Sequence, residues 1–195
     1  LIAQLEKRGI DIILTAQTNF GNGYPEKNID TGAFTYDFEK CRIHEDARAI
    51  AAQEKYISAL SKHKNPYTGK TYADDPSIIS MEINNEPCHM SSSRQVKDYI
   101  NTMVKALRRA GWKKPILYNV SHNGDVVDGY YDADIQGTTY QWYPIGLVAG
   151  HERKGNFLPY VADYNIPFSD RKRFDRMAKV VYEFDPADML ESYLF

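Results

Sequence analysis

The chain has 195 residues, of which 43% are hydrophobic and 26% are charged, and its formal net charge at pH 7 is −2. This composition is typical of an ordinary globular protein, and the length fits one domain over 1–195. The small net charge excludes a strong field that would gather nucleic acid or an anionic membrane surface. No apolar stretch approaches the roughly 20 residues of a membrane span. Nothing in the sequence indicates an oligomeric state.

The chain opens without a Met and in the middle of an amphipathic pattern. Residues 1–8 are typical of the end of a helix, with Gly9 as its stop, and not of a signal peptide. We therefore expect a piece of a longer protein.

Helical and extended patterns alternate along the chain. They predict a helix over 1–8, a strand over 10–15, a helix over 44–63, a strand over 77–84, a helix from the serines at 91–93 to 109, strands over 114–120 and 134–140 with a short helical piece between them, a short helix over 171–177 and a strand over 179–184. Strands that alternate with helices favour parallel βαβ units. Long loops follow several strands, which favours a barrel with its active face built from those loops. A Rossmann-type sheet is disfavoured, because the glycines at 21–23 lie in a long loop.

Two glutamates stand at the ends of predicted strands. The strand over 77–84 delivers Asn85, Glu86 and Pro87 to its carboxyl end, and Glu183 lies near the end of the last strand, with two strands between them. Barrel enzymes carry catalytic groups at the carboxyl ends of their strands. A pair of carboxyl groups can hydrolyse a glycoside, since one protonates the leaving oxygen and the other attacks the anomeric carbon. The pattern predicts a glycosidase.

This arrangement resembles clan A of the glycoside hydrolases, whose members are (β/α)8 enzymes with the acid/base on strand 4 and the nucleophile on strand 7. The run over 65–79 resembles the approach to strand 4 in family 5 endo-β-mannanases. The resemblance implies an α/β fold, a partial TIM barrel that covers strands 3 to 7 and lacks strands 1, 2 and 8. A complete barrel takes about 250 residues, and we expect unpaired sheet edges in this one.

The resemblance also implies roles for individual residues. Glu86 corresponds to the acid/base and Glu183 to the nucleophile of a retaining double displacement on β-linked poly- or oligosaccharides of the β-mannan or β-glucan kind. Asn85 corresponds to the residue that bonds the 2-hydroxyl of the sugar, and Tyr143 to the tyrosine that orients the nucleophile. Further candidate sugar contacts are Trp142, His122 and Tyr140, the last of which fits the core equally well. No metal or organic cofactor is implied, and the expected location is secreted or periplasmic.

One departure leaves alternatives open. Family 5 expects His-x-Tyr after strand 6, whereas this chain has Gln141-Trp142-Tyr143. A family 2-type exo-β-glycosidase, a β-galactosidase or β-mannosidase, therefore stays open, as does a carbohydrate-binding barrel without catalysis. Residues 86–89 also match Glu-x-x-His, a metal-binding spacing that needs a helix. Pro87 argues against a helix there, so a metal-dependent enzyme is the weakest alternative.

Several other polar residues receive structural predictions. Glu82 is expected as a layer residue inside the barrel or a salt-bridge partner, and His44 and His63 as surface residues. Asn119 fits a glycosylation sequon but lies in a predicted buried strand. The two cysteines, Cys41 and Cys88, could form one bridge, but we expect two unlinked structural residues, because two thiols are far from a disulfide framework.

Overall fold

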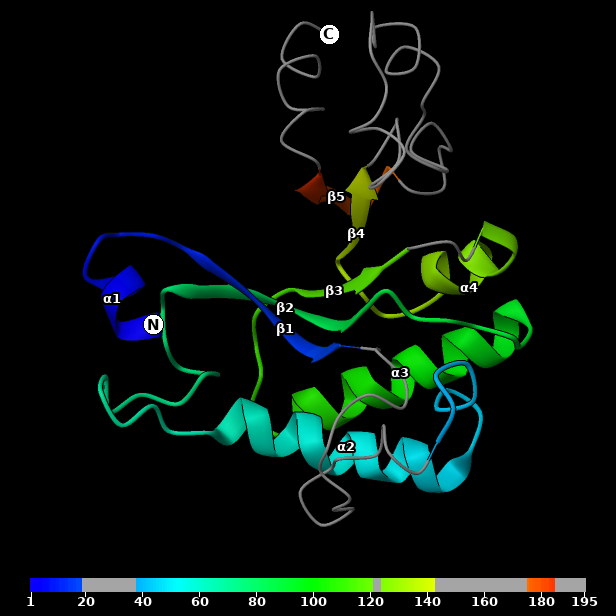
Figure 1. The fold of residues 1–195 in the computed structure, drawn as a ribbon, viewed down its shortest axis with the longest axis horizontal. Helices are drawn as coiled ribbons and strands as arrows, with labels where there is room; N and C mark the ends of the chain where they lie inside the picture. Colours follow the sequence, from blue (N-terminus) through cyan, green and yellow to red (C-terminus); the bar gives the residue numbers. More distant parts are fainter. Residues whose placement is uncertain (19–37, 121–123, 143–174, 185–195) are drawn as a thin grey trace, which may run out of the picture.

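The computed structural model describes residues 1–18, 38–120, 124–142 and 175–184. Its strands form one sheet of five parallel strands in the order β1-β2-β3-β4-β5 (Figure 1). The elements are α1 (Ile2–Glu6), β1 (Ile12–Thr18), α2 (Ala47–Lys62), β2 (Ile78–Asn85), α3 (Ser93–Arg109), β3 (Ile116–Asn119), the 3-10 turn η2 (Gly124–Val126), α4 (Val127–Tyr131), β4 (Gly137–Trp142) and β5 (Ala178–Phe184). Sequential parallel order is that of a barrel, since the strand order of a Rossmann-type sheet reverses.

The five predicted strands are confirmed, with ends that shift by up to three residues. The predicted short helical piece is α4, and Gly9 ends α1 with a φ of 67°. Helix α2 begins later than predicted, because the carboxylate of Asp46 accepts a hydrogen bond of 2.8 Å from the backbone N–H of Arg48 and caps the helix. The predicted helix over 171–177 lies mostly outside the described residues, and 175–177 form no helix.

The sheet curls around its own concave face. Glu82 of β2 accepts a hydrogen bond from the Thr139 hydroxyl of β4, and Asn85 of β2 accepts one from Gln141 of β4. Both bonds pass over β3, which lies between these strands. In a flat sheet, strands separated by a third lie about twice 4.8 Å apart, so these contacts require curvature. The described strands thus form a curved sheet, as in part of a barrel.

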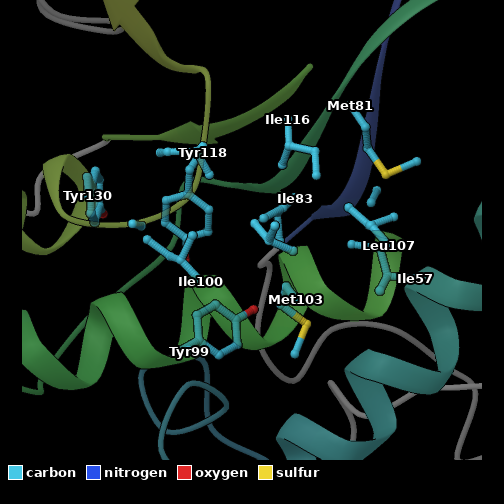
Figure 2. Close-up of a cluster of buried hydrophobic side chains, with 14 of the residues drawn as sticks. Ile57, Met81, Ile83, Tyr99, Ile100, Met103, Leu107, Ile116, Tyr118 and Tyr130 are labelled. Atoms are coloured by element: carbon cyan, nitrogen blue, oxygen red, sulfur yellow. The ribbon is translucent and has the colours of Figure 1, made fainter. Parts of the chain in front are cut away.

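Helices α2 and α3 cover the other face of the sheet (Figure 1). Figure 2 shows side chains of α3 packed against Met81 and Ile83 of β2 and against Ile116 and Tyr118 of β3. The buried face of α3 is mostly apolar, and its members include Val96, Ile100, Met103, Val104 and Leu107. Burial of each such side chain stabilises the fold by about 1.5–3 kcal/mol. This packing fixes β2, and with it the position of Asn85 at its end.

Helix α2 buries a face that contains both apolar and polar side chains. Ile57 is fully buried, whereas Ala51 is exposed. Its buried face consists of Ala49, Ala52, Gln53, Ile57 and Ser61. The polar Gln53 fits this face because its amide donates to the backbone carbonyls of Ile43 and Ala49, at 2.7 and 3.0 Å. The helix is therefore tied to the segment that precedes it.

Strands β1 and β5 are the edges of the described sheet, as expected. Ile13 of β1 and Ile79 of β2 keep 37% and 44% of their surface exposed, whereas the strands of a parallel sheet are usually buried on both faces. The helices of the described residues include none that is long and apolar enough to span a membrane.

Candidate active site

The carboxyl ends of β2, β4 and β5 lie at one edge of the sheet, because the strands are parallel. Strand β2 ends at Asn85 and leads into Glu86, while Glu183 is the penultimate residue of β5 and is described by its backbone alone. Gln141 of β4 pairs in register with Glu183, and its Nε2 donates a hydrogen bond of 3.0 Å to Oδ1 of Asn85. Gln141 therefore links the strands that carry the two predicted catalytic residues.

Glu86 has an unusual backbone conformation. Its φ is 48°, and it is the one non-glycine with positive φ among the described residues. Its side chain is partly exposed, while the following Pro87 is buried. A left-handed conformation costs an ordinary residue free energy, and such outliers gather at functional sites where the surroundings hold them. Glu86 thus combines a left-handed backbone conformation with a partly exposed side chain at the carboxyl end of β2.

A polar layer lies inside the curl of the sheet, below this edge. Glu82 is fully buried and accepts hydrogen bonds from the hydroxyls of Thr15 and Thr139, the first at 3.2 Å. Asn119 is also fully buried and donates to the Thr139 hydroxyl over 3.2 Å. The prediction of Glu82 as an interior layer residue is confirmed, and so is the burial of Asn119. Side chains from four strands meet in this layer.

Two histidines pack together next to the Glu86 turn. The ring centroids of His44 and His89 are 4.3 Å apart. Nε2 of His44 lies 3.2 Å from the Asn84 amide nitrogen, and Nε2 of His89 lies 2.9 Å from the Tyr118 hydroxyl. Burial is the main cause that lowers the pKa of His44 to about 3 and that of His89 to about 2, so both rings are neutral at neutral pH. The prediction of His44 at the surface is wrong, because its ring fills the space under the turn.

His63 is exposed, as predicted. The sequence misses the His44 environment because nothing in its local pattern distinguishes a histidine before a helix from a surface one. The contact partners of His44 are 40 or more residues away along the chain.

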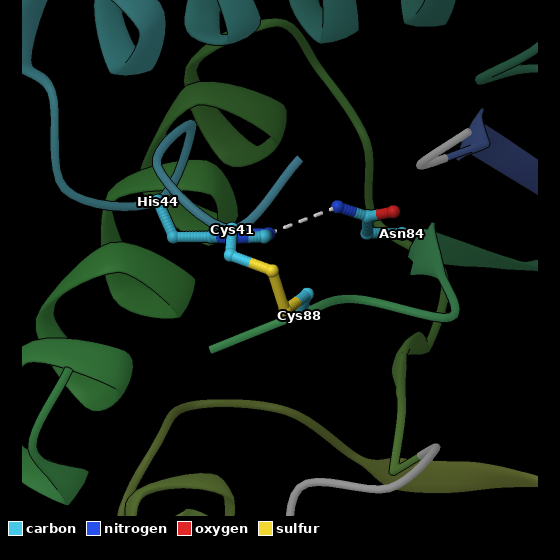
Figure 3. The surroundings of a disulfide bond; sticks show 4 residues. All are labelled: Cys41, His44, Asn84 and Cys88. Atoms are coloured by element: carbon cyan, nitrogen blue, oxygen red, sulfur yellow. Dashed lines mark hydrogen bonds between the residues drawn. A yellow bond between two sulfur atoms is a disulfide. The ribbon is translucent and has the colours of Figure 1, made fainter. Parts of the chain in front are cut away.

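Cys41 and Cys88 form a disulfide bond, with their Cα atoms 4.7 Å apart and a sequence separation of 47 (Figure 3). The expectation of two unlinked cysteines is wrong. Their count and spacing are uninformative here, because the fold brings the segment before α2 next to the segment after β2. The bond lies two residues beyond Glu86.

The Glu-x-x-His spacing does not form a metal site of the helical kind. Glu86 and His89 lie in a turn and an extended segment after β2, and His89 is bonded to Tyr118. Within the described ranges, no group of three or more His, Cys, Asp or Glu side chains is arranged to hold a metal ion.

Among the further predicted sugar contacts, Tyr140 alone has a described side chain. Tyr140 is 2% exposed, belongs to the core, and accepts a hydrogen bond of 3.1 Å from the Thr138 hydroxyl. Its ring offers no face to a sugar, so the predicted substrate contact is corrected to a core residue. Burial raises the pKa of its hydroxyl. Trp142 ends β4 with its side chain undescribed, and His122 and Tyr143 lie outside the described residues.

The sequence matches no protein-family model, and no curated protein matches it. Solved structures match its fold. The endo-1,4-β-mannanase from Rhizomucor miehei superposes with a TM-score of 0.65 at 18% identity over 94% of this chain and 57% of its own. The hyperthermostable endo-1,4-β-D-mannanase from Thermotoga petrophila RKU-1 matches with a TM-score of 0.68 and 16% identity, over 94% of this chain and 57% of its own. A glycoside hydrolase family 5 mannosidase from Rhizomucor miehei matches with a TM-score of 0.66 and 15% identity, over 94% of this chain and 49% of its own.

These matches confirm the predicted fold. The chain has the fold of a partial (β/α)8 barrel, and it is similar in fold to two endo-1,4-β-mannanases and a family 5 mannosidase. It spans about half the length of the structures it matches. At this level of identity the likeness concerns the fold, and the chemistry has to be argued from the residues of the chain itself.

Proposed function

We propose that this chain carries the two catalytic carboxylates of a retaining glycoside hydrolase that cleaves β-linked poly- or oligosaccharides. Glu86 is the acid/base and Glu183 is the nucleophile. The observation that carries the proposal is the chain of contacts at the carboxyl edge of the sheet. Asn85 bonds to Gln141, and Gln141 pairs in register with Glu183. Residues from strands far apart in sequence thus meet where a barrel enzyme performs its chemistry.

The proposed reaction has two steps. In the first, the Glu183 carboxylate attacks the anomeric carbon while the Glu86 carboxyl group gives its proton to the departing glycosidic oxygen. This leaves a glycosyl ester on Glu183 and an ionised Glu86. In the second, Glu86 takes a proton from a water molecule whose oxygen attacks the anomeric carbon and releases Glu183. Two inversions give net retention.

Asn85 assists the chemistry in this proposal. Its amide bonds the 2-hydroxyl of the sugar at the cleavage point, an interaction that strengthens as the oxocarbenium-like transition state forms. The position of Asn85, next to Glu86 and tied to Gln141, supports this role. No metal or organic cofactor takes part in the mechanism.

The structural relatives support a β-mannan-like substrate. Two of them are named as endo-1,4-β-mannanases and the third as a family 5 mannosidase. The proposed substrate class also includes β-glucans. The Cys41–Cys88 bond supports a secreted or periplasmic location, since disulfides persist in oxidising compartments.

The proposal is tested with the complete protein on a panel of mannan, glucan, galactan and their oligosaccharides. Glu86→Gln and Glu183→Gln are each expected to lower turnover of the best substrate by about a hundredfold or more. Glu54→Gln, on α2, is the matched control and retains activity. Unchanged turnover in both site variants would end the proposal. A wild-type protein that binds glycans without cleaving them would support a non-catalytic carbohydrate-binding barrel instead.

A further inference from the structure

The Glu86 turn is fastened to the segment before α2 on both of its sides. Two residues before Glu86, the Asn84 amide contacts Nε2 of His44 at 3.2 Å. Two residues after it, Cys88 is bonded to Cys41. Figure 3 shows the two links side by side, from the short segment 41–44 to the two arms of the turn. We call Cys41, His44, Asn84 and Cys88 the clamp.

The turn needs such support. Glu86 has a φ of 48°, and the proline that follows it restricts its backbone further. An isolated chain would relax from this conformation, so the neighbours must hold it. The clamp holds the residues on both sides of Glu86 and leaves its side chain partly exposed.

The segment to which the turn is fastened is itself rigidly placed. Ile43 is 1% exposed, and its carbonyl accepts a hydrogen bond of 2.7 Å from the Gln53 amide of α2. Gln53 in turn accepts a bond of 2.6 Å from the Tyr99 hydroxyl of α3. The His44 ring packs edge-on against Tyr99, with centroids 4.8 Å apart. The clamp therefore connects the Glu86 turn to both helices that cover the sheet.

We propose that the clamp residues Cys41, Cys88 and His44 are positioning residues for the Glu86 carboxyl group. They keep the left-handed turn in the one orientation from which Glu86 reaches the leaving oxygen. This inference rests on the proposed acid/base role of Glu86. Loss of the clamp therefore impairs proton donation specifically, while sugar binding and the nucleophile on β5 are spared.

Leaving-group dependence separates this role from plain stabilisation of the fold. The dinitrophenolate of a dinitrophenyl glycoside departs without a proton, whereas the leaving oxygen of an unactivated oligosaccharide needs a proton from the acid. The test compares kcat/KM of the complete Cys41→Ala/Cys88→Ala protein for both substrates, well below its unfolding temperature. We expect a loss of about tenfold or more on the oligosaccharide, part of the 10²–10⁴ that general acid catalysis supplies. On the dinitrophenyl glycoside we expect a loss of less than about threefold by the same reasoning.

Equal losses on both substrates, or no loss on either, would overturn the inference and leave the disulfide a purely structural bond. His44→Leu, which keeps the disulfide and removes the contact with Asn84, provides a second test if the double cysteine variant does not fold. It is expected to show the same preference for the activated substrate, and equal losses in it would likewise overturn the inference.

Glu86→Gln, measured on the same two substrates, separates the two proposals. A variant that keeps kcat/KM for the dinitrophenyl glycoside and loses it for the oligosaccharide supports the acid/base role. If Glu86→Gln shows this signature and the clamp variants do not, the clamp inference alone is wrong. If Glu86→Gln does not show it, the proposed function of Glu86 is wrong.

Discussion

The amide nitrogen of Gln141 donates a hydrogen bond of 3.0 Å to the amide oxygen of Asn85 and so joins the ends of β4 and β2 across β3. The bond fixes which way the Asn85 amide faces, because an amide has an accepting and a donating end. Its oxygen is turned to Gln141 and its nitrogen is turned away. The residue that departs from the family 5 pattern thus orients the residue that matches it.

We predict that Gln141→Ala lowers kcat/KM through Asn85. Loss of one hydrogen bond of this kind costs about 1 kcal/mol, which corresponds to roughly a fivefold loss of rate if the bond supports the transition state. Steady-state kinetics of Gln141→Ala, Asn85→Ala and the double variant measure the coupling. We expect the double variant to be little worse than Asn85→Ala alone, because the two residues act together.

Gln4→Ala, in α1, is the control for this series and should leave kcat/KM unchanged. Fully additive losses for Gln141 and Asn85 would show that Gln141 acts independently of Asn85, contrary to the prediction.

We predict that the fold loses stability as the pH falls below about 6.5. His44 and His89 have pKa values of about 3 and about 2 when folded, against 6.5 when exposed. Below pH 6.5 the unfolded chain therefore binds more protons than the folded one, and the free energy of unfolding decreases as the pH decreases. Each histidine contributes a loss of about 2 kcal/mol between pH 7 and pH 5. Urea unfolding across this range measures the loss.

His89→Gln should lower the number of protons taken up on unfolding by one. His63→Gln, at an exposed position, should leave that number as in the wild type. A variant without His89 that keeps the full slope between pH 7 and pH 5 would assign the titration to other groups.

We predict that Glu82 is required for the stability of the barrel interior. Glu82→Ala leaves the hydroxyls of Thr15 and Thr139 without their acceptor and opens a cavity, so the free energy of unfolding should fall by about 3 kcal/mol. Glu82→Gln keeps one accepting oxygen and the side-chain volume, and should cost about 1 kcal/mol. Chemical denaturation of both variants tests this order, and an alanine variant as stable as the wild type contradicts it.

The parts of the fold that depend on local pattern were predictable from the sequence. The run from Ile78 to Asn85 is a buried strand because it is apolar and β-branched, and the capping box of Ser92 and Gln95 begins α3. Gly9 follows α1 with a positive φ, as its position predicts. The parallel arrangement of the strands followed from their alternation with helices.

The parts that depend on distant contacts were not predictable. The Cys41–Cys88 bond and the burial of His44 arise because the segment before α2 lies against the segment after β2. Tyr140 fits a strand that could present it to a sugar or to the core, and only packing decides for the core. Gln141 could be read from the sequence as a departure from a motif, but its partner Asn85 is 56 residues away.

The central claim is that Glu183 and Glu86 perform a double displacement, and trapping of the covalent intermediate tests it most directly. A 2-deoxy-2-fluoro glycosyl fluoride slows the second step more than the first, so the glycosyl-enzyme should accumulate. After incubation with the complete protein, peptide mass spectrometry locates the adduct. We predict a single glycosyl label on Glu183 and faster loss of that label in wild type than in Glu86→Gln. A label on any other residue, or continued turnover of a natural substrate by Glu183→Gln, would contradict the account.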